Sequence, residues 1–284
     1  MNIKQVGDGK VVLLAGGGKI YTDIAARFCR SEKSLDEIIA SPYDKNIVKN
    51  ILDANHLAAT EFDYFIFGIE GYARVTEVQL VRKRMASYLI KSGRVEKNGK
   101  RSFDMVVPKD NIFMEAVGTT PIDIRSVEIY DESNDKWVDI WEYFPGVLSS
   151  RSYRVKLSTM QILGAIETWY DNALARGVKE EDARYLKPQA TEFKAIIGLN
   201  IHGLLDWFKI RCCRNAQSEI SDLARKMLKL CKEAAPDLFE NAGASCVALG
   251  YCPENKRQNI MCKGIVPTLN DVKALIKDHY KRDV

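Results

Sequence analysis

The sequence predicts an α+β fold in which a central antiparallel or mixed sheet is flanked by long helices. Two segments, 62–73 and 191–199, are rich in aromatic and aliphatic residues and read as strands buried on at least one face. Three further segments place apolar residues at helical spacing: 157–175, 200–211 and 216–234. The length of 284 residues is compatible with one domain that carries an insertion, so we expect a single domain over residues 1–284.

The N-terminal part begins with a short apolar strand at 10–14, followed by the run Gly16-Gly17-Gly18-Lys19. A phosphate-binding loop needs an earlier glycine and a Ser or Thr after the lysine, and both are missing here. We therefore expect the glycines to form a turn, with a phosphate role as the less favoured alternative. A helix is expected over 20–30, and a pair of helices interrupted at Pro42 over 34–55.

After the strand at 62–73, helical spacing of Val75, Val78 and Gln79 predicts a helix that brings Arg82 to Arg84 to its C-terminal end. The stretch 112–152 has little pattern but is rich in turn signals, which predicts a strand-containing insertion. In the C-terminal half, Asn200 is placed as the N-cap of the helix that runs to Arg211.

The tail at 241–284 contains Cys246, Cys252 and Cys262 and ends in an expected amphipathic helix at 268–282. The cysteine spacings do not match a zinc-binding pair, so we expect free thiols and no metal, with a structural zinc as the alternative. Seven cysteines in all, an odd number, argue against a disulfide framework. With no apolar run of 18 residues and no signal-like N-terminus, the prediction is a cytoplasmic protein without membrane association.

Metal-dependent hydrolases and enzymes with a Ser-His-Asp triad are disfavoured, because the chain has only three histidines. The G-x-S-x-G, H-E-x-x-H and G-x-G-x-x-G motifs are also missing. A mild net charge of +4, with arginines spread over several elements, does not predict nucleic-acid binding. Guanidinium groups bind phosphate and carboxylate in bidentate fashion, so arginines near the ends of elements predict an anion site, although ordinary surface positions explain them as well. These arginines are Arg27, Arg82, Arg84, Arg94, Arg184 and Arg211.

The order of five short sequence blocks favours an anion site over ordinary surface arginines. Arg82-Lys83-Arg84, then seven residues, then Ser92, resembles the R-H-R-x7-S signature of the flavin-dependent thymidylate synthases. Four more blocks resemble that family in the same order: Ala25 to Cys29, Ala183 to Pro188, Asn200 to Arg211 and Ala216 to Ile220. Together the blocks span roughly residues 24 to 240, which is most of the chain.

The resemblance implies an enzyme that converts dUMP to dTMP, with methylenetetrahydrofolate as carbon donor, FAD as cofactor and NADPH as the reductant of the flavin. It implies a homotetramer whose sites are shared between subunits. It also implies catalysis without a cysteine nucleophile.

The same resemblance assigns the site. Two of the substrate-binding positions, Ser92 and Arg211, are also the expected catalytic positions. The full substrate-binding set is Gln79, Ser92, Gly93, Arg94, Arg184 and Arg211. The cofactor-binding set is His56, Arg82, Lys83, Arg84, Asn200, His202 and Asp206, where His56 matches only if one residue is inserted.

Four positions depart from the family pattern. Lys83 replaces the histidine of R-H-R, Ile90 replaces a frequent glutamate, His202 replaces an arginine and Asp206 replaces an asparagine. These departures leave two alternatives open. One is a diverged member that methylates or hydroxymethylates another pyrimidine nucleotide, and the other is a non-catalytic flavin- or nucleotide-binding protein.

Overall fold

The computed structural model describes residues 3–17, 21–92, 103–109, 121–124, 128–131, 135–139, 153–156, 159–254, 262 and 266–280. The chain divides into two compact units. The larger, called the sheet unit, contains residues 2–99, 103–107 and 189–284, and the smaller consists mainly of residues 108–188. The expected organisation as one domain with an insertion stays a prediction.

The sheet unit is built on a four-stranded sheet in the order β2-β3-β10-β4, with every neighbouring pair antiparallel. The predicted strands are confirmed as β2 (Lys10–Ala15), β3 (Tyr64–Ala73) and β10 (Glu192–Asn200). The edge strand β4 (Ala86–Ile90) was not predicted. A separate parallel pair joins β1 (Ile3–Gln5) to β5 (Met105–Val107).

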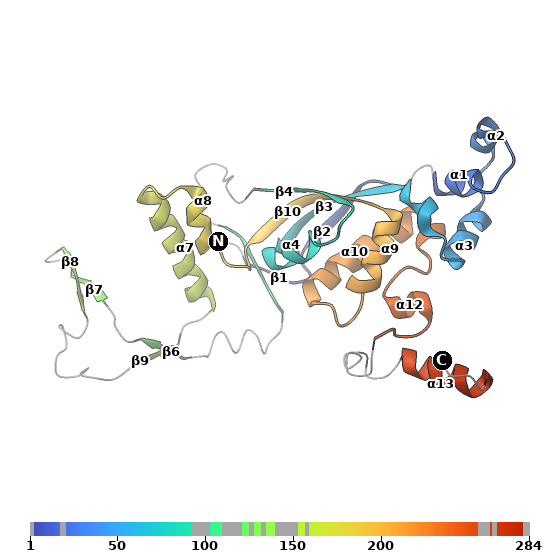
Figure 1. Cartoon of the computed structure of the whole chain (residues 1–284). Helices are drawn as coiled ribbons and strands as arrows, with labels where there is room; N and C mark the ends of the chain where they lie inside the picture. Colours follow the sequence, from blue (N-terminus) through green and yellow to red (C-terminus); the bar gives the residue numbers. More distant parts are fainter. Residues whose placement is uncertain are drawn as a thin grey trace. The chain divides into compact units, whose positions relative to one another are not determined.

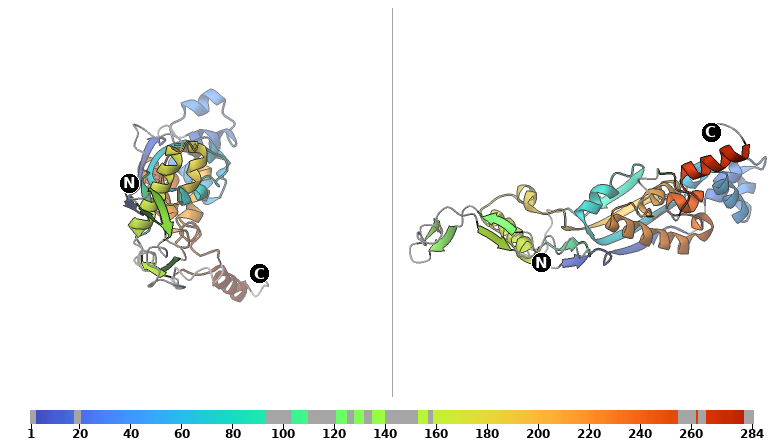
Figure 2. Two further views of the ribbon diagram at one scale, coloured as in Figure 1. Left: turned by 90° about the vertical axis from the view of Figure 1, so that its left-hand side faces the viewer. Right: turned by 90° about the horizontal axis from the view of Figure 1, so that it is seen from below.

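Two long helices cover one face of this sheet, as Figures 1 and 2 show. They are α9 (Ile201–Arg211) and α10 (Ser218–Ala234), close to the predicted bounds. Their inner faces pack against alternate residues of the central strands, and this contact forms the core. Its largest fully buried side chains include Phe65, Phe67, Tyr72, Ile197, Leu204 and Phe208.

The opposite face of the sheet is apolar but exposed. Val12, Gly68, Ile196 and Leu89 lie side by side across the four strands in register. Ile196 is 44% exposed and Leu89 is 70% exposed. In the described part of the chain, this face therefore presents apolar side chains to solvent instead of burying them.

Smaller helices complete the sheet unit, and the expected pair interrupted at Pro42 is confirmed as α2 and α3. Their bounds are α1 (Tyr21–Phe28), α2 (Leu35–Ala40), α3 (Lys45–Asp53), η1 (Leu57–Glu61), α4 (Arg74–Leu80), α11 (Pro236–Phe239), α12 (Ser245–Leu249) and α13 (Leu269–Tyr280). The helix expected over 20–30 is α1, and the one expected over 268–282 is α13. Within the described residues, no helix is long and apolar enough to span a membrane.

The turn predicted at the glycines after β2 is confirmed for the two that the structure describes. Gly16 and Gly17 have φ values of +127° and +78°, in the region that favours glycine. A Cβ on Gly17 would stand 2.6 Å from the Cβ of Ala234 in α10, so the turn also needs the missing side chain for close packing. Gly18 and Lys19 lie outside the described residues.

The described residues of the smaller unit form two antiparallel strand pairs and three helices. Its strands are β6 (Pro121–Ile124), β7 (Glu128–Asp131), β8 (Lys136–Asp139) and β9 (Tyr153–Lys156), and its helices are α7 (Thr159–Ala175), α8 (Glu180–Ala183) and η2 (Arg184–Leu186). Three of the strands fall inside 112–152, where strands were expected, and α7 confirms the helix expected over 157–175.

A buried carboxylate from α10 fixes the start of α4. Glu219 is 1% exposed, and its Oε1 accepts a hydrogen bond of 2.9 Å from the backbone N–H of Ala73, the N-cap of α4. Its Oε2 accepts a short hydrogen bond from the hydroxyl of Thr76. An isolated seven-residue helix is unstable in water, so these contacts hold α4 in place together with the burial of Leu80.

Replacing Glu219 with alanine should therefore destabilise the protein. The change leaves the buried Ala73 N–H and the Thr76 hydroxyl without their acceptor, and we expect a loss of about 2–4 kcal/mol in the free energy of unfolding. Glu219→Gln keeps an acceptor at Oε1 and should lose less than about 1 kcal/mol. Chemical denaturation of both variants measures this, and an unchanged Glu219→Ala variant would contradict the anchoring role.

The same residue should give stability a pH dependence. Burial raises the pKa of Glu219 above its ordinary value of 4.5, so the folded state favours the protonated carboxyl. The contribution of this group to stability is complete below pH 4.5 and is lost as the pH rises through the folded-state pKa. Glu219→Gln lacks the titration, so its stability relative to the wild type should increase as the pH rises above 4.5. Denaturation at several pH values checks this difference, and a constant difference would contradict it.

Candidate active site

The predicted basic motif lies in the turn between α4 and β4. The turn ends at Met85, whose φ of +58° reverses the chain. The Tyr88 hydroxyl lies 2.9 Å from the carbonyl oxygen of Leu80 and 2.8 Å from that of Lys83, so it ties the start of the turn to its middle. Burial raises the pKa of Tyr88 to about 12, which keeps this donor protonated. Arg82 and Arg84 project from the turn and are exposed.

A second predicted arginine meets this region from the end of α9. Nη1 of Arg211 donates to Oε1 of Gln79 at 3.2 Å, which joins the last turns of α9 and α4. The pKa of Arg211 is lowered by burial and further by the charge of Arg82. The structure therefore brings Gln79, Arg82 and Arg211 together, as predicted.

These guanidinium groups have no acidic partner among the residues that the structure describes. The ion pairs found there leave Arg82, Arg84 and Arg211 without a carboxylate. Arg82 and Arg211 are close enough to repel each other. A bound anion would relieve this repulsion. The arrangement is that of an anion site.

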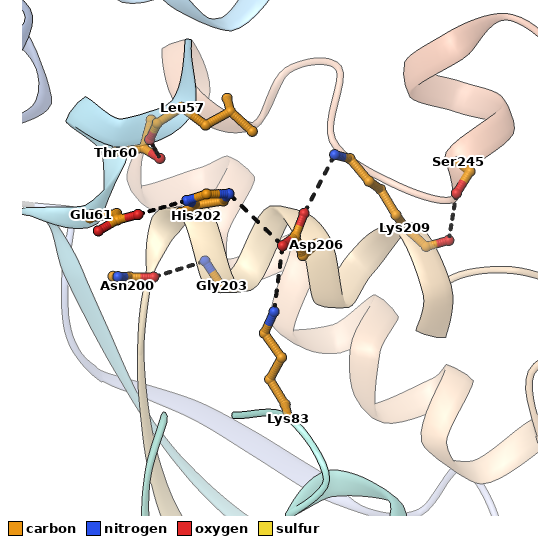
Figure 3. Close-up of polar contacts among 10 residues, drawn as sticks. All are labelled: Leu57, Thr60, Glu61, Lys83, Asn200, His202, Gly203, Asp206, Lys209 and Ser245. Carbon is orange, nitrogen blue, oxygen red and sulfur yellow. Dashed lines mark hydrogen bonds and ion pairs between the residues drawn. The ribbon is translucent and has the colours of Figure 1, made fainter. Parts of the chain in front are cut away.

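Beside it lies a group of five charged or titratable side chains, called the Asp206 cluster: Glu61, Lys83, His202, Asp206 and Lys209. Asp206 is at its centre (Figure 3). Its Oδ2 lies 3.6 Å from Nζ of Lys83 and 3.9 Å from Nε2 of His202, and its Oδ1 lies 3.6 Å from Nζ of Lys209. Nδ1 of His202 lies 3.0 Å from Oε1 of Glu61. Two of the four family departures, Lys83 and His202, thus lie against a third, Asp206.

Asn200 is the N-cap of α9, as predicted. Its Oδ1 accepts a hydrogen bond of 2.8 Å from the N–H of Gly203 and so satisfies a free donor at the helix start. A Cβ on Gly203 would stand 3.0 Å from that oxygen and 3.7 Å from Cε of Lys83. The helix start is therefore tightly packed against both Asn200 and the basic turn.

The other predicted residues are not brought to this place by described contacts. His56 is exposed just before η1, and in the described part of the chain it has no hydrogen bond or ion pair with the site. Ser92 is exposed two residues after β4, whereas Gly93 and Arg94 lie outside the described residues. Arg184 belongs to the smaller unit, where its Nε donates to the carbonyl oxygen of Glu181 at 3.1 Å.

Arg27 has a structural role. It pairs with Asp23 at 3.0 Å within α1 and donates to the carbonyl oxygen of Pro42 at 2.7 Å. It is therefore an ordinary helix arginine, which was the alternative explanation in the sequence.

Sequence reasoning missed three residues that shape the site: Glu61, Tyr88 and Glu219. Glu61 follows no motif, and nothing local points to its contact with His202. Tyr88 lies in the alternating run 86–90, whose period of two was a usable signal for β4. Glu219 was noticed only as part of the block Ala216 to Ile220, and its burial under α4 is a tertiary contact.

The predicted cysteines line one cavity of about 350 Å³ together with Cys212 and Cys213. All are free thiols, and burial raises the pKa of Cys212 to about 11. Across the described residues, no group of three His, Cys, Asp or Glu side chains is placed to hold a metal ion.

Comparison with known proteins identifies the family. The family model described as thymidylate synthase complementing protein matches residues 18–237. A flavin-dependent thymidylate synthase from Nitratidesulfovibrio vulgaris is 33% identical over 221 residues, which cover 74% of this chain and 73% of the relative. The enzyme of the same name from Geobacter sulfurreducens is 30% identical over 234 residues, covering 81% and 84%.

A solved structure confirms the predicted fold class. The UMP/dUMP methylase PolB from Streptomyces cacaoi, bound with 5-Br dUMP, superposes with a TM-score of 0.57 at 17% identity, covering 84% of this chain and 96% of that one. Its complex with 5-Br UMP gives a TM-score of 0.55. The family model matches most of this chain, and relatives that are 30–33% identical are flavin-dependent thymidylate synthases. The chain therefore belongs to the family of flavin-dependent thymidylate synthases.

Proposed function

We propose that this protein catalyses the FAD-dependent reductive methylation of dUMP to dTMP, with methylenetetrahydrofolate as carbon donor and NADPH as reductant. The observation that carries the proposal is the anion site in which Arg211 meets Gln79 beside Arg82. Membership of the family supplies the reaction, since the relatives are flavin-dependent thymidylate synthases.

The basic turn suits the cofactor. Arg82 and Arg84 are exposed and, in the described residues, free of carboxylate partners, as residues that bind a diphosphate would be. When bound, FAD would supply the hydride. Lys83, Asn200, His202 and Asp206 would contact it in our assignment, and His56 is the weakest member because no described contact links it to the others.

The nucleotide would bind on the other side of the turn. Arg211, held by Gln79, would neutralise negative charge on the nucleotide, either on its phosphate or on the uracil carbonyls as charge develops during carbon transfer. Because burial holds Arg211 in a low-dielectric position, its interaction with an anion is stronger than that of a surface arginine. Ser92, Gly93, Arg94 and Arg184 complete the proposed substrate set.

One observation favours a diverged substrate preference as the second candidate. Ile90, at the position where the family often has glutamate, packs its half-buried side chain against the core. The nucleotide site therefore lacks a carboxylate from this position, and recognition of another pyrimidine nucleotide is the alternative.

We also propose that the protein assembles as a homotetramer. The exposed apolar face of the four-stranded sheet supports this, because contiguous apolar patches on a protein surface commonly mark interaction sites. A second copy of the chain is the occupant that the family resemblance implies. The proposal of a cytoplasmic protein is retained from the sequence.

Purified protein incubated with FAD, NADPH, methylenetetrahydrofolate and dUMP should yield dTMP, detected by the mass of the product. UMP and dCMP, offered in parallel, separate the leading proposal from the diverged alternative. Arg211→Gln should lower kcat/KM for the nucleotide by about 100-fold, since a partly buried arginine that compensates an anion is lost. Flavin oxidation with no change in nucleotide mass for any substrate would contradict the proposed reaction.

Ile196→Glu should reduce the assembly to smaller species, because it places a charge in the centre of the exposed sheet face. Light scattering coupled to gel filtration gives the mass of the particle. The matched control is Leu275→Glu in α13, where leucine is 69% exposed but does not belong to the sheet. Assembly that is equally insensitive to both changes would place the interface elsewhere.

A further inference from the structure

The Asp206 cluster joins two parts of the site that are far apart in sequence. Asp206 lies in the middle of α9, with His202 one turn before it and Lys209 one turn after it. Lys83 reaches Asp206 from the turn after α4, as Figure 3 shows. In the described residues, the Lys83–Asp206 pair is the ion pair that links the basic turn to α9.

We propose that Asp206 is a positioning residue that holds Lys83 beside His202 for the cofactor, so that the three departures from the family pattern work as one coupled unit. The inference rests on the proposed function, because it concerns the binding of FAD. It goes beyond that proposal by predicting that Lys83 and Asp206 depend on each other.

Charge balance is the first argument. With a neutral His202, the cluster has two carboxylates, Glu61 and Asp206, and two ammonium groups, Lys83 and Lys209, so its net charge is zero. Without Lys83 the cluster would carry one net negative charge beside the exposed Arg82 and Arg84. A negative charge there would repel a ligand that carries a diphosphate. An aspartate at this position is therefore compatible with such a ligand because Lys83 compensates it.

Geometry at His202 is the second argument. A carboxylate can only accept hydrogen bonds, so Nδ1 of His202, 3.0 Å from Glu61, carries a proton. This orients the ring with Nε2 toward Asp206, at 3.9 Å. Glu61, at the end of η1, thereby fixes the orientation of the imidazole, and Nε2 faces Asp206 in α9 at a distance too long for a hydrogen bond.

Exposure is the third argument. The side chains of Lys83, His202 and Asp206 are 23%, 35% and 44% exposed. Ion pairs at such exposure contribute little to the stability of the fold. Their effect is therefore local, on the position and the charge of the turn that we assign to the cofactor.

A double-mutant cycle tests the inference, with the dissociation constant of FAD measured by fluorescence for the wild type, Lys83→His, Asp206→Asn and the double variant. Lys83→His alone should weaken FAD binding about three- to tenfold, because it leaves the charge of Asp206 uncompensated. Asp206→Asn alone should change the affinity less than about twofold. The double variant, which has the histidine and asparagine of the family pattern, should return to about the wild-type affinity, within roughly twofold, so that Lys83→His weakens binding only while Asp206 is present. Recovery of affinity by a second substitution is a result that a merely structural role of Asp206 would not give.

The matched control is the pair Lys229 and Glu233, which lie 3.9 Å apart, four residues apart on α10, and are both exposed. Replacing each with glutamine, singly and together, removes an ion pair away from the turn and should leave FAD affinity unchanged. Thermal midpoints of all variants show that each is folded.

The outcomes separate two failures. If the wild type binds FAD but the two substitutions have independent, multiplicative effects, the coupling is wrong and the proposed function stands. If the wild type binds no FAD, the proposed function fails, and this inference fails with it.

Discussion

The buried carboxylate of Glu219 is the contact on which the site depends. It accepts hydrogen bonds at the start of α4, a helix too short to be stable alone, and so makes α10 the support of that helix. The basic turn begins directly after the buried Leu80, so the positions of Arg82 and Lys83 follow from how α4 is held. A polar group buried in the core therefore determines where the charged residues of the basic turn lie at the surface.

The antiparallel pairing of β3 and β10 explains why the cations meet. Tyr64 pairs with Asn200 and Ala73 with Glu192, so α4 and α9 begin at opposite ends of the paired strands. Their C-terminal ends then approach one another, where Arg211 contacts Gln79. Helix C-termini carry partial negative charge and stabilise cations nearby, which eases the clustering of guanidinium groups that have no described acidic partner.

Three departures from the family pattern, which look like separate losses in the sequence, form one contact network in the structure. Lys83 lacks the imidazole of the family motif, but it gains Asp206 as a partner, and His202 gains Glu61. Ile90 differs from these, because it packs against the core and takes no part in the network. The cofactor side of the proposed site has thus changed together, whereas the nucleotide side has lost a carboxylate without a described replacement.

The sequence alone determined the fold class, the central strands, the long helices and the family, because hydrophobic period and short sequence blocks can be read along the chain without the tertiary structure. Asn200 could be placed as an N-cap for the same reason, since capping is decided within four residues. Glu219 under α4, Glu61 on His202 and the ion pair between Lys83 and Asp206 could not be found in this way. They join residues separated by more than 120 positions, and only the folded sheet and its covering helices bring such charges within contact distance.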